Sequence, residues 1–122
     1  PIQRLQLANI SLYESCDQTQ IRDFYQLSDY VILPSISTPD WKEQFGRVLT
    51  EGILCGCTAL GSNSGNIPMI LRDKDTIFDE SDPDSLSRLL SRLPLVNAEE
   101  IHTKQLEYVN KKFLWSKIAS KT

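Results

Sequence analysis

The sequence predicts an α/β domain built on a parallel sheet. Short apolar runs alternate with amphipathic stretches along the 122 residues, and each apolar run lies close to Gly, Pro, Asn, Asp or Ser. The connections between the expected strands and helices are short, which implies right-handed crossovers and helices packed on the sheet. No internal repeat or linker divides the chain, so we expect one domain over residues 1–122.

The first half of the chain predicts two strand–helix pairs. Asp17 suits the N-cap of the first helix because apolar side chains follow it near helical spacing. Pro34 ends a buried type of strand, and Gly56 suits the positive φ that often follows a helix. The expected elements, in order, are a strand over residues 8–13, a helix over 18–28, a strand over 30–33, a loop over 35–44 and a helix over 46–55.

The second half continues the alternation and ends in helices. Pro68 suits the first turn of a short helix, and Asp82 with Pro83 suits the N-cap and first position of a longer one. The expected elements are a strand over residues 58–60, a turn over 62–66, a short helix over 67–71, a strand over 76–78, a helix over 82–93, and C-terminal helices over 98–113 and 115–121.

The composition is that of a globular domain with a formal net charge of −3. No apolar stretch approaches the roughly 20 residues of a membrane-spanning helix, and no signal-peptide pattern follows Pro1. Three cysteines without CxxC spacing make no disulfide framework and favour a reduced, cytoplasmic setting. Because the chain begins with Pro1 rather than Met, we expect it to be part of a longer protein.

Charge is distributed unevenly along the chain. Residues 101–122 hold five lysines against one acid, a charge of +4, which leaves −7 on the rest. No basic patch interleaved with aromatics is large enough for a nucleic-acid groove, so no nucleic-acid partner is expected. The lysines favour the solvated face of a terminal helix; the alternative is an edge that meets an anionic membrane or another domain.

The carboxyl ends of the strands are where a ligand is expected. In parallel sheets ligands bind outside these ends, which here means the loops after Tyr13, Leu33 and Leu60. Glu43 and Glu51 are separated by seven residues and flank the start of the helix expected from residue 46. Free backbone N–H groups and the positive end of the helix dipole favour phosphate there, and carboxylates accept bonds from sugar hydroxyls. From spacing alone the signal is weak, and an exposed Glu43 with Glu51 on the helix surface would be the favoured interpretation.

A longer motif surrounds the two glutamates. Residues 34–56 read P-S-I-S-T-P-D-W-K-E-Q-F-G-R-V-L-T-E-G-I-L-C-G, and residues 61–68 read G-S-N-S-G-N-I-P. Together they closely resemble the C-terminal domain of GT-B, family 4 retaining glycosyltransferases, in the subset with a W-K-E-Q-F-G-R-V-L block before the E-x7-E pair. Agreement extends from about Ile10 to the end of the chain. The resemblance implies a partial Rossmann-like parallel sheet with helices on both faces, the C-terminal portion of a GT-B donor domain.

The same resemblance implies roles for individual residues. Glu43 would contact hydroxyls of the donor sugar and is in that sense the catalytic residue, while Glu51 would bind ribose hydroxyls. The backbone of Ser15 and Cys16 would lie against the nucleotide base. The donor-binding positions implied are Glu43, Phe45, Gly46, Arg47, Val48 and Glu51. No side chain is assigned as general base or nucleophile, and neither a metal ion nor a cofactor is expected.

The sequence also departs from the family pattern. Gly52 stands where alanine is usual and Asn66 where glutamate is usual, while Arg72 and Asp75 replace glycines. The acceptor-binding N-terminal domain, and the glycine-rich loop with its Arg/Lys pair that begins the donor domain, have no counterpart here. We therefore expect a fragment that does not turn over alone.

The functional hypothesis is the donor-binding part of a retaining, metal-independent hexosyltransferase. It would take a nucleotide-diphosphate sugar, UDP- or GDP-linked, and serve a saccharide or lipid acceptor in polysaccharide, lipopolysaccharide or glycolipid synthesis, in the cytoplasm or at the inner face of the membrane. The alternative is a non-catalytic binding or assembly module that keeps the fold. A sugar-nucleotide epimerase is a third class, against which the W-K-E-Q-F-G-R-V-L block argues.

Two other kinds of site find little support in the sequence. Cys55, Cys57 and His102 fall short of a zinc ligand set, and buried core roles are expected for the cysteines. Ser35 and Ser64 lack the G-x-S-x-G context of a hydrolase, so loop or turn roles are expected for them.

Overall fold

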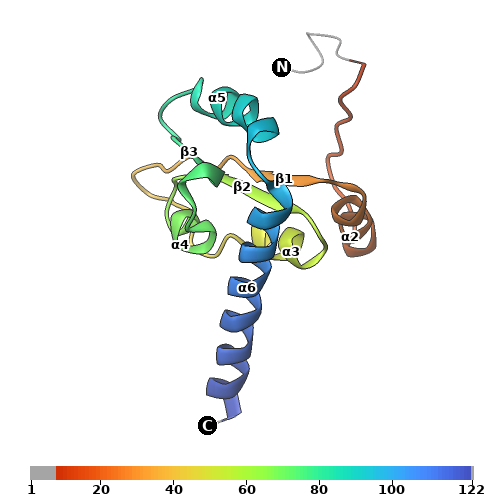
Figure 1. Cartoon of the computed structure of the whole chain (residues 1–122), viewed down its shortest axis with the longest axis vertical. Coiled ribbons are helices and arrows are strands. Elements are labelled where there is room, and N and C mark those ends of the chain that lie inside the picture. Colours follow the sequence, from red (N-terminus) through yellow and green to blue (C-terminus); the bar gives the residue numbers. More distant parts are fainter. Residues whose placement is uncertain (1–7, 122) are drawn as a thin grey trace.

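The protein is an α/β unit with three parallel strands (Figure 1). A computed structural model describes the backbone of residues 8–121 and the side chains of residues 8–112. Its elements, in chain order, are α2 (Gln18–Leu27), β1 (Tyr30–Leu33), α3 (Arg47–Leu54), β2 (Thr58–Ser62), α4 (Ile67–Leu71), the 3₁₀ turn η1 (Lys74–Thr76), β3 (Ile77–Phe78), α5 (Ser85–Arg92), the 3₁₀ turn η2 (Leu93–Leu95) and α6 (Ala98–Lys121).

The sheet has the order β1-β2-β3, and both pairings are parallel. Tyr30 pairs with Thr58, and Gly61 pairs with Ile77, so β2 is the central strand. All five residues of β2 are buried, as expected for the middle of a parallel sheet that is covered on both faces. The predicted parallel α/β fold is confirmed.

Alternate residues of the strands enter two separate cores. On one face α3, α4 and α6 pack against the sheet, and on the other face α5 and η2 do so (Figure 1). The buried residues of the first core are Leu49, Ile53, Ala59, Ile67, Leu71 and Val109. The buried residues of the second core are Leu60, Phe78, Leu89 and Leu93. Neighbours Ala59 and Leu60 thus point to opposite faces, which is the period-two alternation of a strand.

The predicted first helix is confirmed together with its cap. Asp17 and Gln20 form a capping box at the start of α2. The Gln20 N–H donates to Asp17 Oδ1 at 2.8 Å, and the Asp17 N–H donates to Gln20 Oε1 at 3.0 Å. Two otherwise unpaired N–H groups are satisfied in this way, which fixes where the helix begins.

The strand predicted over residues 8–13 is wrong. This segment has no strand pairing; its side chains Ile10, Leu12 and Tyr13 are 40%, 57% and 62% exposed. It lies beside α2 instead, where the Tyr13 ring packs on Phe24 with centroids 4.8 Å apart. A strand is stable only against a neighbouring strand, and within residues 8–121 none lies beside this segment.

The predicted start of the helix over residues 82–93 is also wrong. Asp82 does not cap the helix and Pro83 is not its first residue, because α5 begins at Ser85. The Asp82 carboxylate instead accepts the Asp84 N–H at 3.0 Å and pairs with Arg88 at 2.5 Å. The hydrogen bond from Arg88, followed by the one from the Asp84 backbone, lowers the pKa of Asp82 below its ordinary value. Asp82 therefore builds a turn before the helix.

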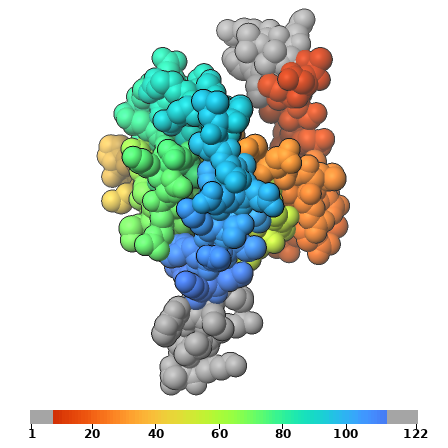
Figure 2. Space-filling model, in the orientation of Figure 1, coloured from red at the N-terminus to blue at the C-terminus, as the bar shows by residue number. Residues whose placement is uncertain are grey.

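The C-terminal part is one helix rather than two. α6 is continuous over 24 residues, from Ala98 to Lys121, across the break expected at residue 114. In the space-filling view residues 98–112 of α6 lie over the middle of the molecule, with the loop between β1 and α3 at the rim beside α4 (Figure 2). Over residues 8–121 we find no helix that is both long and apolar enough to cross a bilayer.

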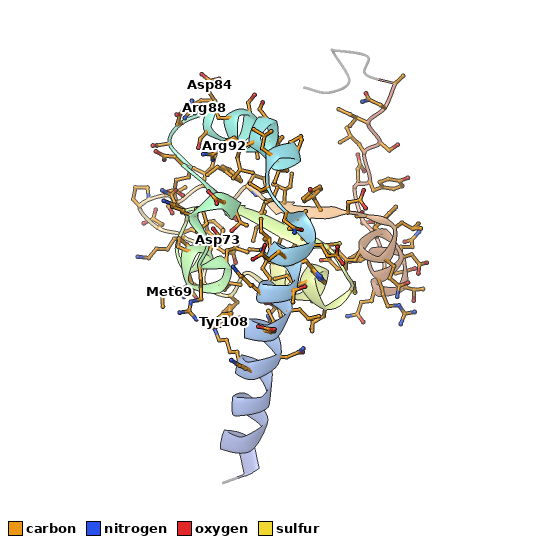
Figure 3. The ribbon with its side chains drawn as sticks, viewed as in Figure 1. Met69, Asp73, Asp84, Arg88, Arg92 and Tyr108 are labelled. Carbon is orange, nitrogen blue, oxygen red and sulfur yellow. The ribbon has the colours of Figure 1, made fainter. Side chains whose placement is uncertain are left out.

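α4 ends on Arg72 in the left-handed backbone region, with φ 65°. Glycine usually stands here in the family that the sequence resembles. In this chain the Arg72 guanidinium stacks on the Tyr108 ring, with Cζ 4.8 Å from the ring centroid. Figure 3 labels Tyr108 on α6, with Met69 of α4 near it. A cation–π contact between α4 and α6 is the feature that a glycine could not provide.

Candidate functional site

Three loops meet at the carboxyl ends of the strands. The loops follow β1 (residues 34–46), β2 (residues 63–66) and β3 (residues 79–84). The Ser37 hydroxyl lies 2.8 Å from the Ser64 hydroxyl and donates to Glu80 at 3.0 Å, so one side chain from each loop joins the cluster. This is the edge at which parallel sheets bind ligands.

Glu43 is held in place by two hydrogen bonds to its carboxylate. Ser35 Oγ donates to Glu43 Oε2 at 3.1 Å, and the Gly46 N–H donates to Glu43 Oε1 at 3.1 Å. The side chain is half-buried. Each oxygen keeps a further lone pair, because a carboxylate can accept about four hydrogen bonds in all. Glu43 is therefore both ordered and able to accept hydrogen bonds from a ligand.

The backbone of Glu43 is fixed by the loop after β2. The Asn66 N–H donates to the Glu43 carbonyl at 2.9 Å, and Asn66 Nδ2 donates to the Gln44 carbonyl at 2.9 Å. Gly65 lies so close that a Cβ there would be 1.8 Å from the Glu43 carbonyl oxygen. Its φ of 51° also favours glycine. Asn66, which departs from the family pattern, thus helps to hold the loop of Glu43.

Gly46 is the N-cap of α3 and adopts the left-handed conformation, with φ 55° and ψ 38°. Its carbonyl accepts the Leu49 N–H at 3.0 Å. Arg47 and Val48, the first two residues of α3, have N–H groups with no carbonyl partner within the helix. Phe45 is 66% exposed, and the Arg47 guanidinium carbon lies 5.6 Å from its ring centroid. This end of α3 thus offers backbone donors, a cation and an aromatic face.

Glu51 lies one turn further along α3 and faces α2. The Tyr25 hydroxyl donates to Glu51 Oε2 at 3.3 Å. Burial, and then the Glu51 charge and hydrogen bond, raise the pKa of Tyr25 from 10.0 to about 12. Tyr25 is therefore a hydrogen-bond donor to Glu51 throughout the neutral range.

A cavity of about 450 Å³ lies between α2 and α3, beside Glu51. Its lining consists of Gln18, Ile21, Arg22, Tyr25, Glu51, Leu54 and Cys55. Ser15 and Cys16 directly precede the cap of α2; Ser15 is exposed and Cys16 half-buried. The structure thus brings Glu51 and the start of α2 to one cavity, while Glu43 lies with Ser35 at the start of α3.

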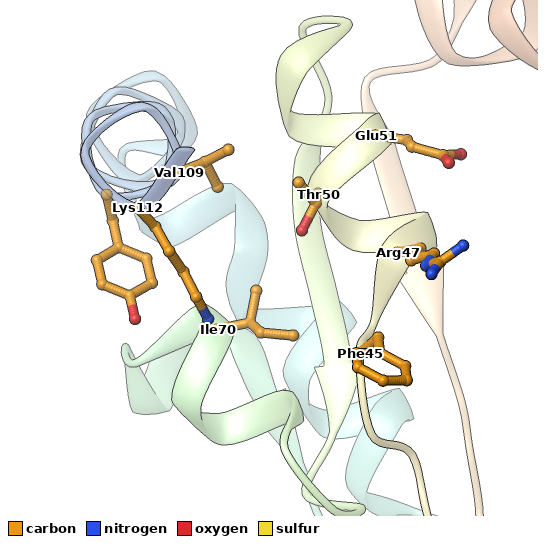
Figure 4. Close-up of a pocket in the computed structure, with 8 residues that line it drawn as sticks. Phe45, Arg47, Thr50, Glu51, Ile70, Val109 and Lys112 are labelled. Carbon is orange, nitrogen blue, oxygen red and sulfur yellow. The ribbon is translucent and has the colours of Figure 1, made fainter. Parts of the chain in front are cut away.

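A second cavity of about 390 Å³ lies where α3 approaches α4 and α6. Figure 4 shows Thr50, Ile70, Val109 and Lys112 between these helices. Phe45, just before α3, and Arg47 and Glu51 of α3 also line this cavity (Figure 4). Glu51 lines both cavities. Arg47 lines only the cavity beside α4 and α6, whereas Glu51 lies between the two cavities.

Cys55, Cys57 and His102 do not converge. The Cys57 Sγ–H donates to the Tyr25 carbonyl at 3.0 Å, and burial raises the pKa of this thiol above its ordinary value. His102 Nε2 lies 3.1 Å from the Ile53 carbonyl. Within the described residues no group of three His, Cys, Asp or Glu side chains could hold a metal ion.

Sequence reasoning missed four residues of this region: Tyr25, Ser37, Asn63 and Glu80. Tyr25 was one of several apolar-type residues on an amphipathic helix, and Ser37 was one of several polar loop residues. Glu80 lies in an acidic run in which nothing marks it out, and it meets Ser37 across 43 positions. Only the sheet topology, which brings the loops after β1 and β3 to one edge, could have paired them.

Comparisons with known proteins identify the family of the chain. Residues 2–112 match the family model described as glycosyl transferases group 1. One subunit of the phosphatidylinositol N-acetylglucosaminyltransferase of Arabidopsis thaliana is 29% identical over 84 residues, which cover 66% of this chain and 18% of that protein. N-acetyl-alpha-D-glucosaminyl L-malate synthase of Bacillus anthracis is 29% identical over 85 residues, which cover 70% of this chain and 21% of that protein. The chain thus spans about a fifth of the length of either relative.

Proposed function

Because this chain belongs to the glycosyl transferases of group 1, we propose that it is the donor-binding part of a retaining transferase. In this proposal the whole enzyme moves a hexose from a nucleotide-diphosphate sugar to a saccharide or lipid acceptor. The observation that carries the proposal is the start of α3, where Gly46 and the ordered carboxylate of Glu43 meet in a chain that the family model matches over residues 2–112.

The donor diphosphate would lie at the start of α3. The N–H groups of Arg47 and Val48 and the positive end of the helix dipole favour an anion there. A Cβ at Gly46 would lie 2.6 Å from Ile70 Cδ1, so glycine allows the close turn that begins the helix, and the Arg47 guanidinium would add charge. Phe45 would contribute an exposed ring against the sugar.

The sugar and the nucleoside would lie on either side of the diphosphate. Glu43 has lone pairs left for the hydroxyls of the hexose, while Ser35 and Gly46 hold it in place. Glu51 would accept the ribose hydroxyls, because it faces the cavity between α2 and α3. Ser15 and Cys16 lie just before α2, from where their backbone would contact the base.

Transfer would proceed with the nucleoside diphosphate leaving as the anomeric carbon gains positive charge. Charge then accumulates on the departing phosphate, and preorganised donors aimed at it lower the barrier. The amides of Arg47 and Val48, with the Arg47 guanidinium, would supply part of this stabilisation without a metal ion. We assign no side chain as general base or nucleophile. The acceptor would be bound by an N-terminal domain, so this chain alone would not turn over.

The printed names of the two relatives support a choice of donor sugar and of setting. Both names contain an N-acetylglucosaminyl group, so we propose N-acetylglucosamine as the first donor sugar to test. One name contains phosphatidylinositol, which supports a lipid acceptor and peripheral association of the whole protein with the inner face of a membrane.

Calorimetric titration tests the proposal. The probes are UDP-N-acetylglucosamine, UDP-glucose, GDP-mannose, UDP and GDP. We expect one nucleotide series to bind, and Glu51→Ala to weaken it about tenfold or more, because charged hydrogen bonds contribute about 1.5–3 kcal/mol. Glu107→Ala, an exposed carboxylate on α6 that lines neither cavity, is the matched control.

Two results would contradict the proposal. If none of the probes binds, the non-catalytic module is the better account of the chain. If the purified 122-residue chain transfers sugar by itself, the claim that it requires a further domain is wrong.

A further inference from the structure

The Glu80 carboxylate reaches across the carboxyl edge of the sheet to the loop after β1. Its Oε2 atom accepts the Ser37 N–H at 2.9 Å and the Ser37 hydroxyl at 3.0 Å. One oxygen thus fixes both the backbone and the side chain of a single loop residue. Such a double contact leaves Ser37 little freedom to rotate or shift.

Glu80 is itself held by the loop after β2. Its backbone N–H donates to Asn63 Oδ1 at 2.9 Å, and the Asn63 N–H donates to the Phe78 carbonyl at 2.9 Å. The buried Ser64 hydroxyl lies 2.8 Å from that of Ser37. Because the one Ser37 hydroxyl hydrogen goes to Glu80, Ser64 donates to Ser37. Ser37 is therefore bound to the loops after both β2 and β3.

A short path links Ser37 to Glu43. Ser35, two residues earlier, donates its hydroxyl to Glu43 Oε2 at 3.1 Å. The Ser35 carbonyl accepts the Ser62 hydroxyl at 2.5 Å. The segment from Ser35 to Ser37 is thus fixed at both ends by residues of other loops and strands, and one of its hydroxyls sets the position of the Glu43 carboxylate.

We propose that Glu80 is a positioning residue for donor binding, which acts through Ser37 and Ser35 to aim Glu43 at the sugar. This rests on the proposed function, in which Glu43 contacts the donor. Glu80 itself touches no donor atom in this account. Loss of its carboxylate frees Ser37, the loop after β1 shifts, and Glu43 no longer presents its oxygens in one orientation.

The test compares Glu80→Ala with Glu80→Gln. The amide oxygen of glutamine can accept both hydrogen bonds from Ser37, whereas alanine accepts neither. Titration with UDP-N-acetylglucosamine and GDP-mannose should give Glu80→Ala a roughly tenfold weaker affinity, because the misaligned Glu43 carboxylate loses charge-assisted hydrogen bonds to the sugar. Glu80→Gln should bind with nearly the affinity of the unaltered protein.

Two further variants separate positioning from general destabilisation. In a Glu43→Ala background, Glu80→Ala should cause little additional loss, because both changes remove the same interaction. Leu89→Val lowers stability through the core on the other face of the sheet and should leave affinity unchanged. Equal loss from Glu80→Ala in both backgrounds, or no loss from it, would overturn the proposal.

A measurement without ligand keeps this inference apart from the proposed function. Hydrogen exchange of the Ser37 and Gly46 amides should be faster in Glu80→Ala and unchanged in Glu80→Gln, because these N–H groups donate to Glu80 and Glu43. If the unaltered protein binds no probe, donor binding fails as its function and with it the role proposed for Glu80. If it binds a probe but exchange at Gly46 is the same in all variants, Glu80 does not position Glu43.

Discussion

The side-chain amide of Gln105 forms hydrogen bonds with both backbone groups of Ala59. The Ala59 N–H donates to Gln105 Oε1 at 2.9 Å, and Gln105 Nε2 donates to the Ala59 carbonyl at 2.9 Å. β3 pairs with β2 only from Gly61 onward, and the preceding residues form the 3₁₀ turn η1. A glutamine of α6 therefore replaces the missing part of the third strand.

Replacing Gln105 by leucine should lower the free energy of unfolding by about 2–4 kcal/mol. Gln105 is 4% exposed and Ala59 fully buried, so two backbone groups would lose their partner away from water. Urea unfolding measures the change. Glu107→Leu, at an exposed position of the same helix, should change stability by less than about 0.5 kcal/mol. A similar small change for Gln105→Leu would contradict the role of the amide.

Gly52→Ala should destabilise the protein by about 1–3 kcal/mol, although alanine favours helices. A Cβ at Gly52 would lie 2.5 Å from Val31 Cγ1 and 3.0 Å from its Cβ, because α3 packs closely on β1. Val31→Ala makes room for this methyl group. The double variant should therefore be more stable than the sum of the two single effects predicts. An increase in stability for Gly52→Ala would contradict the close packing of α3 on Val31.

Gly65→Ala should reduce both stability and donor affinity. The new Cβ would overlap the Glu43 carbonyl and break the bond from the Asn66 N–H. Gly56→Ala is the matched control, since Gly56 also has a positive φ, of 104°, but no atom lies within 4 Å of its Cβ position. It should show only backbone strain, of order 1–3 kcal/mol, and unchanged affinity. Equal affinity loss in both variants would show that Gly65 has no particular effect on Glu43.

Tyr25 gives the protein a pH dependence in alkaline solution. Its pKa is raised from 10.0 to about 12 in the folded state, so the folded protein holds the phenol proton more tightly than the unfolded chain does. Its contribution to the free energy of unfolding is fully present below pH 10 and falls as the pH rises toward 12. The free energy of unfolding measured across this range should therefore decline, and it should decline less in Tyr25→Phe. An identical decline in both proteins would contradict the shift.

The sequence predicted the elements whose signals are local. Apolar runs identified β1 and β2, and the Asp17 cap identified the start of α2. The strand prediction for residues 8–13 was wrong because an apolar run forms a strand only beside another strand. The prediction that Asp82 caps the helix was wrong because its carboxylate bonds the Asp84 N–H and Arg88 in a turn before the helix.

For the candidate site, too, the sequence showed only local features. The glycine at the start of α3 and the spacing of Glu43 and Glu51 were visible in the sequence, and the roles assigned to them remain predictions. The partners of Glu43 and Glu51 were not visible, because Tyr25 and Ser35 become partners only once α2 and β1 are folded. Gln105 was hidden for a similar reason: a polar residue on an amphipathic helix is usually solvated.

Contacts of the candidate site and of the sheet join residues that are distant in the chain, and this sets an order of assembly. Ser37 can bond to Glu80 only after a further 43 residues have been made, and Ala59 can bond to Gln105 only after a further 46. During synthesis the loop that carries Glu43 leaves the ribosome well before the residues that fix it, and domains fold as units once their chain is available. The sheet is completed only when α6 has been made. A nascent chain should therefore acquire the proposed donor binding late and in one step, together with the protection of β2 from exchange.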